Sequence, residues 1–279
     1  MTDALVSGLW GRTDHEWSAR NSEGRSRGIL TIWRKDVLQS EFSFSGKGFL
    51  GIMARCKGSI FYFINIYSPC SLIDKRSLWA ELLDWKQKLE RGEWVIGGDF
   101  NSIKNRDERR GKESLRRDVE MGEFGSFIEN MELIDTQIIG GSFTWIKPNG
   151  KACSRLDRIL VSEGLISKWG VVAQEVGNRD ILDHKPVWLK SSRVEWGPKP
   201  FRLNQCWFEH KDFKSFVQKE WTSFSVKESI AFALKERFKN LRGRLRWWNI
   251  NVFGEIDLKI EEDVLAMNKL EEVLMQHND

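Results

Sequence analysis

The sequence predicts an α+β fold, with layers of largely antiparallel β-sheet and a helical tail. Short β-branched and aromatic runs, separated by Gly and charged turns, fill residues 28 to 190. Stretches with helical periodicity interrupt these runs without strict alternation. Near residue 191 the composition shifts toward helical patterns. We therefore expect one domain over residues 1–192 and a separate helical segment over residues 193–279.

Composition restricts the class of protein. Of the 279 residues, 30% are charged and 41% hydrophobic, which is typical of a globular chain. No apolar run approaches the ~20 residues that span a bilayer, so we expect no membrane association. The four cysteines are scattered without a CxxC pair, which favours free thiols in a reducing compartment. The net charge of +4 permits a polyanionic partner without requiring one.

Four strands are expected first, over residues 28–33, 41–46, 49–55 and 59–67. Gly46, Gly48 and Gly51 form a GxGxxG pattern in the turn between the second and third of these strands. Because a strand pattern and no helix follows, this pattern does not indicate a dinucleotide site. A helix is predicted over residues 75–92, and a second helix later in the chain. Their apolar faces are Leu78, Leu82, Trp85 and Leu89 in the first helix, and Phe124, Phe127, Ile128 and Met131 in the second.

The stretch WVIGGDFNSI, residues 94–103, reads as a buried strand that stops at two glycines. Asp99 and Asn101 then lie at the edge of a sheet, where scaffolds present catalytic groups. The alternative is an ordinary Asx turn that closes the strand. Further on, residues 142–146 and 154–162 predict a hairpin with Asn149–Gly150 as its turn.

The segment beyond residue 192 begins with a linker that contains Pro198 and Pro200. Two amphipathic helices are expected after it, the first with one apolar stripe formed by Leu234, Phe238, Leu241 and Leu245. The same helix carries six basic residues and one acid, Glu236. The basic residues are Lys235, Arg237, Lys239, Arg242, Arg244 and Arg246. This face either contacts nucleic-acid phosphates or is a solvated basic surface.

Polar groups at several other strand patterns suggest a shared site. They are Tyr67 at the end of one strand, Asp157 inside another, and Asp183 and His184 just before a third. Metal-assisted phosphodiester hydrolysis needs such a set. His184 would be the general base on water, with Asp157 orienting its imidazole, and Asp99 would align the nucleophile. Asn101 and Tyr67 would donate hydrogen bonds to the phosphoryl oxygens. Taken singly, His184 also fits a core histidine, and Tyr67 a packed aromatic.

These residues carry a resemblance to a known family. GGDFN, SRLDRILVS and DHKPV, in that order and with NIYSP upstream, resemble the endonuclease/exonuclease/phosphatase superfamily. GGDFNSIKNRDERRG, SFTWIKPNGKACSRLDRILVS and the downstream LRWWNINVFGEI are similar to plant non-LTR (LINE-type) retrotransposon polyproteins, over nearly the whole chain. There the endonuclease domain is followed by a connector toward reverse transcriptase.

The resemblance implies a four-layer sandwich of two packed mixed β-sheets flanked by helices, with Mg²⁺ or Mn²⁺ as cofactor and DNA as partner. It assigns catalytic positions to Asp99, Asn101, Asp157, His184 and Tyr67, and a weaker metal position to Asp183. Positions implied for nucleic-acid binding are Thr144, Trp145, Arg155, Arg109 and Arg110. An intact element of this kind would act in the nucleus.

Departures from the family pattern affect the expected activity. The family's first strands, which carry a catalytic Asn and the principal metal-binding Glu, have no match in this sequence. Glu16 and Glu23 are the only acids that could replace that Glu. Leu182 stands where the family usually has a serine before the Asp-His pair. A cation held by few carboxylates loses much affinity when one is deleted. We therefore expect an N-terminally truncated endonuclease with little activity alone. The alternatives are a nucleic-acid-binding module without chemistry, and an active phosphodiesterase with a substituted metal ligand.

Overall fold

The computed structural model describes the chain except residues 12–13, 23–27, 112–116, 149, 151, 180–181, 193–202, 204–206, 209, 224–229, 254–263, 271–272 and 274–279. It divides into two compact units, Met1–Val194 and Glu195–Asp279, and each is described by itself. Glu23, the Asn149 turn position and the linker prolines lie outside the described residues. In the described part of the chain, no helix has the length and apolar character needed to cross a bilayer.

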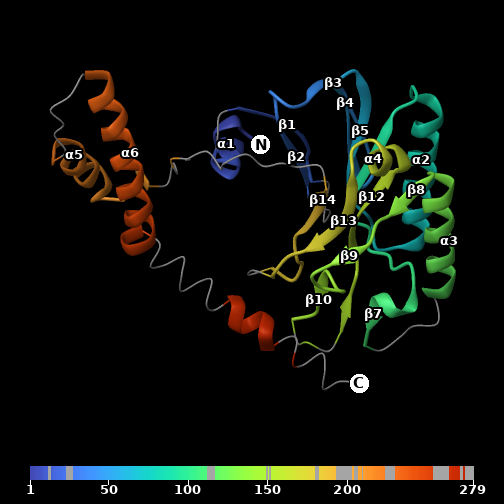
Figure 1. Ribbon diagram of the computed structural model, residues 1–279. Helices are drawn as coiled ribbons and strands as arrows, with labels where there is room; N and C mark the ends of the chain where they lie inside the picture. The colour runs from blue at the N-terminus through green and yellow to red at the C-terminus, as the bar shows by residue number, and fades with distance from the viewer. Residues whose placement is uncertain are drawn as a thin grey trace. The chain divides into compact units, whose positions relative to one another are not determined.

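The first unit is built on a six-stranded mixed sheet in the order β3-β4-β5-β6-β12-β8 (Figure 1). Its strands are β3 (Gln39–Gly46), β4 (Phe49–Cys56), β5 (Ser59–Tyr67), β6 (Glu93–Asp99), β8 (Leu133–Asp135) and β12 (Asp157–Ser162). Strands β5 and β6 are parallel, and their other neighbours in this sheet pair antiparallel. The predicted α+β class is confirmed, and the sheet has the mixed character that the resemblance implied.

Helices α2 (Leu72–Lys88) and α3 (Arg117–Asn130) lie along one face of this sheet (Figure 1). Alternate residues of β5 and β6, such as Ile64 and Ile96, point into the same buried cluster as Trp79 and Phe124 of the helices. Helix α2 begins after Ser71, whose hydroxyl accepts a hydrogen bond from the Asp74 amide at 3.2 Å. It ends at Lys88, four residues earlier than expected, because Leu89 is already extended.

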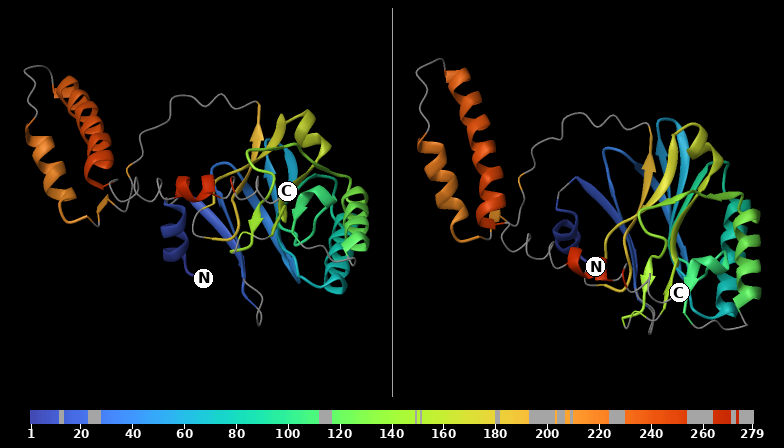
Figure 2. Two further views of the ribbon diagram at one scale, coloured as in Figure 1. Left: turned by 90° about the horizontal axis from the view of Figure 1, so that it is seen from below. Right: turned by 60° about the horizontal axis from the view of Figure 1, so that its bottom comes forward.

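Two smaller sheets lie on the other face, as the views of Figure 2 also show. One pairs β1 (His15–Arg20) with β2 (Ile29–Arg34), and the other has the order β14-β13-β9. The bounds of the latter are Val187–Ser191, Val171–Val176 and Ile138–Ile139. Strand β2 contacts β4 and β5, and β14 contacts β12, so the unit is a β-sandwich. Helix α4 (Glu163–Ser167) joins β12 to β13.

The structure adds two elements that the strand patterns did not reveal, helix α1 (Asp3–Trp10) and strand β1. Local signals for α1 were present in the sequence. The Thr2 hydroxyl accepts from the Leu5 amide at 3.5 Å, and Gly11 closes the helix with a left-handed φ of 68°. Two apolar residues on α1, Leu5 and Leu9, are exposed, which explains the weak periodic signal.

The predicted hairpin of residues 142–146 and 154–162 is only partly correct. Strand β10 (Trp145–Ile146) pairs with β11 (Cys153–Ser154), which also pairs with β7 (Arg109–Arg110), and these form a separate small sheet. The chain leaves this sheet after Ser154, and β12 joins β6 and β8 of the main sheet instead. The amides of Leu156 and Asp157 both donate to the Thr144 hydroxyl at 2.9 Å, and this side-chain acceptor marks the change of sheet.

The second unit contains helices α5 (Phe213–Ser223) and α6 (Ile230–Trp248), a π-helical turn (Asn249–Phe253) and a helix at 264–270. Its core is formed by Trp207, Phe213, Leu245 and Trp248, with Leu241 packed against them. The four residues predicted for one stripe share a face of α6, but only the second half of that stripe packs in this core. The side chains of Leu234 and Phe238 are 46% and 57% exposed, because the core faces the Leu241–Leu245–Trp248 side of the helix.

Candidate active site

Three strands of the main sheet bring Tyr67, Asp99 and Asp157 to one edge. Tyr67 ends β5 and Asp99 ends the parallel strand β6, and these two residues are register partners. Asp157 begins the antiparallel strand β12 and is the register partner of Asp99 on the other side. The three side chains therefore come from one row across the sheet, although 90 residues of sequence separate the first from the last.

His184 joins this row from a different part of the chain. An isolated bridge to Trp145 places its backbone, and its Nδ1 atom lies 2.8 Å from Oδ2 of Asp157. The side chain of His184 is 30% exposed, and that of Asp157 is 17% exposed. The hydrogen bond and charge of Asp157 raise the pKa of His184, although burial opposes this. The arrangement leaves Nε2 of the ring for a substrate or a water molecule.

Asp99 is a buried carboxyl group beside a second carboxyl group. Asp99 is 9% exposed. Its pKa is raised from 3.8 to about 6, mainly by burial and secondly by the nearby charge of Asp157. The amide of Asn101 donates to Asp99 Oδ1 at 2.8 Å and partly offsets this shift. Asp99 is therefore a group that exchanges a proton near neutral pH.

Asn101 is held in place by a buried lysine that the sequence reasoning missed. Asn101 has a left-handed φ of 50°, and its side-chain amide donates to the Ser68 carbonyl at 2.7 Å. Lys75 is 1% exposed, and its Nζ donates to the Asn101 carbonyl at 2.6 Å and pairs with Glu120. Glu120 also accepts from the Ser102 hydroxyl at 3.0 Å. Lysine on an amphipathic helix normally faces water, so only the packed structure identifies this support.

Asp183 lies beside His184 but is engaged by another side chain. The indole Nε1 of Trp145 donates to Asp183 Oδ2 at 3.1 Å, and the Ile146 amide donates to the Asp183 carbonyl at 3.0 Å. The Lys185 amide in turn donates to the Thr144 carbonyl at 2.7 Å. Trp145 thus orients the Asp183–His184 segment as well as lining the site.

A buried network of four charged side chains lies next to the row, where Arg158 follows Asp157 on β12. Arg158 is fully buried and pairs with Glu108 and Asp135, each at 2.8 Å. Arg155 pairs with the same two acids at 3.0 and 2.6 Å. Burial would raise the pKa values of Glu108 and Asp135, but the two guanidinium groups lower both of them. The sequence did not reveal this network, because its members come from separate segments.

The structure buries two of the positions predicted for nucleic-acid binding. Thr144 has no exposed surface, and its hydroxyl accepts the two backbone amides at the start of β12. Arg155 is 8% exposed and belongs to the buried network. Arg109 lines the cavity of the row, and Arg110 is exposed with its guanidinium 5.7 Å from the Phe143 ring centre.

The row opens into a cavity of about 620 Å³. Its walls include Tyr67, Asp99, Asn101, Asp157, Asp183, His184, Arg109 and Trp145. Glu16 is not among its lining residues; it accepts from the Trp33 indole at 3.2 Å, and it lines a different pocket.

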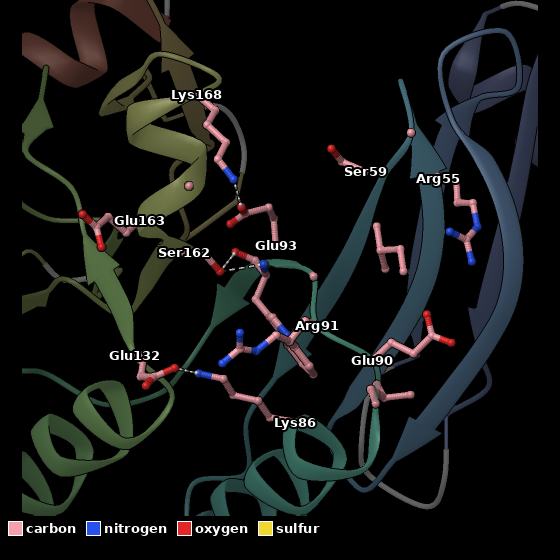
Figure 3. A pocket seen from close by; sticks show the side chains of 16 residues that line it. Arg55, Ser59, Lys86, Glu90, Arg91, Glu93, Glu132, Ser162, Glu163 and Lys168 are labelled. Carbon is pink, nitrogen blue, oxygen red and sulfur yellow. Dashed lines mark hydrogen bonds and ion pairs between the residues drawn. The ribbon is translucent and has the colours of Figure 1, made fainter.

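A larger cavity of about 900 Å³ lies at the opposite end of β5 and β6, where the strands begin (Figure 3). Two pairs of its charged groups neutralise each other, Lys86 with Glu132 at 2.9 Å and Lys168 with Glu93 at 3.8 Å. Size alone does not identify the reactive site. The perturbed pKa values and the convergence of acids with an imidazole favour the smaller cavity.

The side chains at the site do not form a ready cage for a divalent ion. Asp157 is engaged by His184, Asp183 by Trp145, and Asp99 is a carboxyl group with a raised pKa. Among the residues that the structure describes, no group of three or more His, Cys, Asp or Glu side chains is placed to hold a metal. The expectation of a protein-held Mg²⁺ or Mn²⁺ is therefore not met by the donor set present.

Several solved structures are similar to this chain. The 3′ phosphatase NExo from Neisseria, bound to product DNA hairpin, is 18% identical with a TM-score of 0.49, covering 68% of this chain and 83% of that chain. The endonuclease domain of TRAS1, a telomere-specific non-LTR retrotransposon, is 15% identical with a TM-score of 0.48, covering 63% and 77%. D. rerio TDP2 complexed with single strand DNA product is 12% identical with a TM-score of 0.44, covering 68% and 82%.

No curated protein matches the chain significantly. The family model for the endonuclease/exonuclease/phosphatase family matches residues 5–192, which is about two thirds of the sequence. The matched residues include every member of the row formed by Tyr67, Asp99, Asp157 and His184. The chain belongs to the endonuclease/exonuclease/phosphatase family.

Proposed function

We propose that residues 1–192 are a DNA endonuclease domain of the non-LTR retroelement type, which hydrolyses phosphodiester bonds slowly when this chain acts alone. The observation that carries the proposal is the 2.8 Å contact between His184 Nδ1 and Asp157 Oδ2 beside the buried Asp99. The order of the motifs in the sequence supports the retroelement branch.

In this proposal His184 takes a proton from water through Nε2, while Asp157 fixes the orientation of the ring and stabilises the imidazolium. Asp99 accepts a hydrogen bond from the attacking water and aligns it. Asn101 has a second N–H beyond the one given to Ser68, and that N–H donates to a phosphoryl oxygen, as does the Tyr67 hydroxyl. Arg109 provides a positive charge at the same cavity wall.

Slow turnover follows from the incomplete donor set. Members of this family depend on a divalent metal, and removing one electrostatic element of a hydrolytic site costs on the order of 10²–10³ in rate. Because the described side chains do not form a metal-binding group, charge that develops on the leaving oxygen is poorly stabilised here.

The experiment is nicking of supercoiled plasmid, and of an oligonucleotide duplex with an abasic site, at increasing Mg²⁺ or Mn²⁺ concentration. We expect weak cleavage that His184→Ala abolishes and that His15→Ala leaves unchanged. His15 is a matched control because it lies on β1 and lines a different pocket. Absence of cleavage together with intact DNA binding would replace the proposal by a nucleic-acid-binding module without chemistry. Cleavage that survives His184→Ala would also refute it.

A further inference from the structure

Four basic residues form a straight stripe on helix α6. Lys235, Lys239, Arg242 and Arg246 follow one another at intervals of four, three and four residues. At 100° per residue these positions lie within about 60° of each other around the helix axis. All four residues are exposed, and the stripe rises about 16 Å at 1.5 Å per residue.

The stripe is separated from the basic residues that α6 uses for its own packing. Arg244 lies on another side of the helix, and its Nε and Nη2 atoms donate to Glu220 of α5 at 2.8 and 2.9 Å. Arg237 lies with its guanidinium 5.9 Å from the Trp221 ring centre. Within the described part of the chain, the one acid near the stripe is Glu236, 3.6 Å from Lys239. Among the described residues, one acid thus offsets one of the four cations, so this part of the helix keeps a net positive charge.

An exposed aromatic ring borders the stripe. Phe238 lies three residues after Lys235 and four before Arg242, and its side chain is 57% exposed. The Phe238 ring packs against Trp221, with the two ring centres 5.2 Å apart and the ring planes at 62°. A fixed, exposed ring next to a row of cations is the combination that binds a single-stranded nucleic acid, through base stacking and phosphate contacts.

We propose that this face of α6, the stripe together with Phe238, binds the backbone and one base of single-stranded nucleic acid. The stripe is long enough for about four successive phosphates. The site belongs to the second unit and is independent of the reaction proposed for the first. An anionic membrane is the less suitable partner, because insertion needs an apolar helix face and the Leu241, Leu245 and Trp248 face of α6 is already packed in a core.

The test uses the full chain and a fluorescein-labelled single-stranded oligonucleotide, with fluorescence anisotropy measured over a range of salt concentrations. Replacing the four stripe residues by Gln should weaken binding by on the order of 10² at ~0.1 M salt and reduce the slope of log K against log salt by about three. Phe238→Ala should weaken binding about tenfold and leave the slope unchanged, because stacking releases no counterions. Circular dichroism on each variant verifies that the helices persist.

A matched control removes other basic residues of the same unit. Replacing Lys211, Lys214 and Lys219 by Gln changes the net charge by a similar amount on exposed positions outside the stripe. We expect this variant to change the slope by less than one. Equal losses in the stripe and control variants would show a non-specific charge effect and overturn the proposal. If the chain bound phosphatidylserine vesicles as tightly as the oligonucleotide, and only the stripe variant lost that binding, the stripe would instead be a lipid-binding surface. Loss of oligonucleotide binding with plasmid nicking retained, or the reverse, distinguishes failure of this proposal from failure of the nuclease proposal.

Discussion

His184 Nδ1 and Asp157 Oδ2 lie 2.8 Å apart although the residues are 27 positions apart in the chain. Asp157 begins a central strand, and His184 is placed by its backbone bridge to Trp145. The contact engages Nδ1 of the imidazole and leaves Nε2 for a ligand in the cavity that His184 lines.

Asp157→Asn should lower the pKa of His184. The carboxylate raises that pKa by stabilising the imidazolium, and a neutral amide removes the charge while keeping the shape. A pH titration of the His184 ring protons by NMR measures the change. Asp107→Asn, at an exposed position, should leave the His184 titration unchanged. If the pKa of His184 were the same in the Asp157 variant, the two groups would not be coupled in solution.

Asp99→Asn should stabilise the fold at pH 7.5 by about 3 kcal/mol, since its pKa is raised by about two units and each unit corresponds to 1.36 kcal/mol. The folded state holds the Asp99 proton more tightly than the unfolded state does. Its ionised carboxylate therefore costs stability above about pH 6, and this cost disappears as the pH falls below the unfolded value of 3.8.

Urea unfolding of both forms from pH 4 to pH 8 measures this difference. The gain from Asp99→Asn should grow as the pH rises from about 4 to about 6 and level off above pH 6. A gain that is constant over the whole range would show that the benefit comes from packing and not from the charge of Asp99.

Arg158→Met should destabilise the first unit by about 3–5 kcal/mol, because the buried carboxylates of Glu108 and Asp135 lose one of the two positive charges that balance them. Arg106→Met is the matched control. Arg106 pairs with Asp118 at 2.7 Å on the surface, where such a pair is worth about 0–1 kcal/mol. Chemical denaturation gives both values. Similar small losses for the two variants would mean that the buried network relaxes when Arg158 is removed.

Thr144→Val should cost about 2–4 kcal/mol, since it leaves the amides of Leu156 and Asp157 without the acceptor they share. Thr144→Ser keeps the hydroxyl and should lose much less. We also expect the valine variant to shift the His184 titration, because Asp157 follows directly from this turn. A valine variant as stable as the serine variant would show that water replaces the hydroxyl.

The sequence by itself determined the class of fold, several strands and the identity of the row. Strands β4 and β5 and helix α2 were predictable because their apolar periodicity is a local property of consecutive residues. The residues around Asp99, Asp157 and His184 were found because their motifs occur in a fixed order. The supporting charges were not predictable in this way.

Only the tertiary structure decided which polar groups are buried and which apolar groups are not. Lys75 and Arg158 look like surface residues until Glu120, Glu108 and Asp135 are brought beside them from distant segments. Likewise, Phe238 and Leu245 fit the same helical period, but only Leu245 meets the core of the second unit. Periodicity fixes which residues share a helix face, whereas burial depends on contacts between segments far apart in the chain.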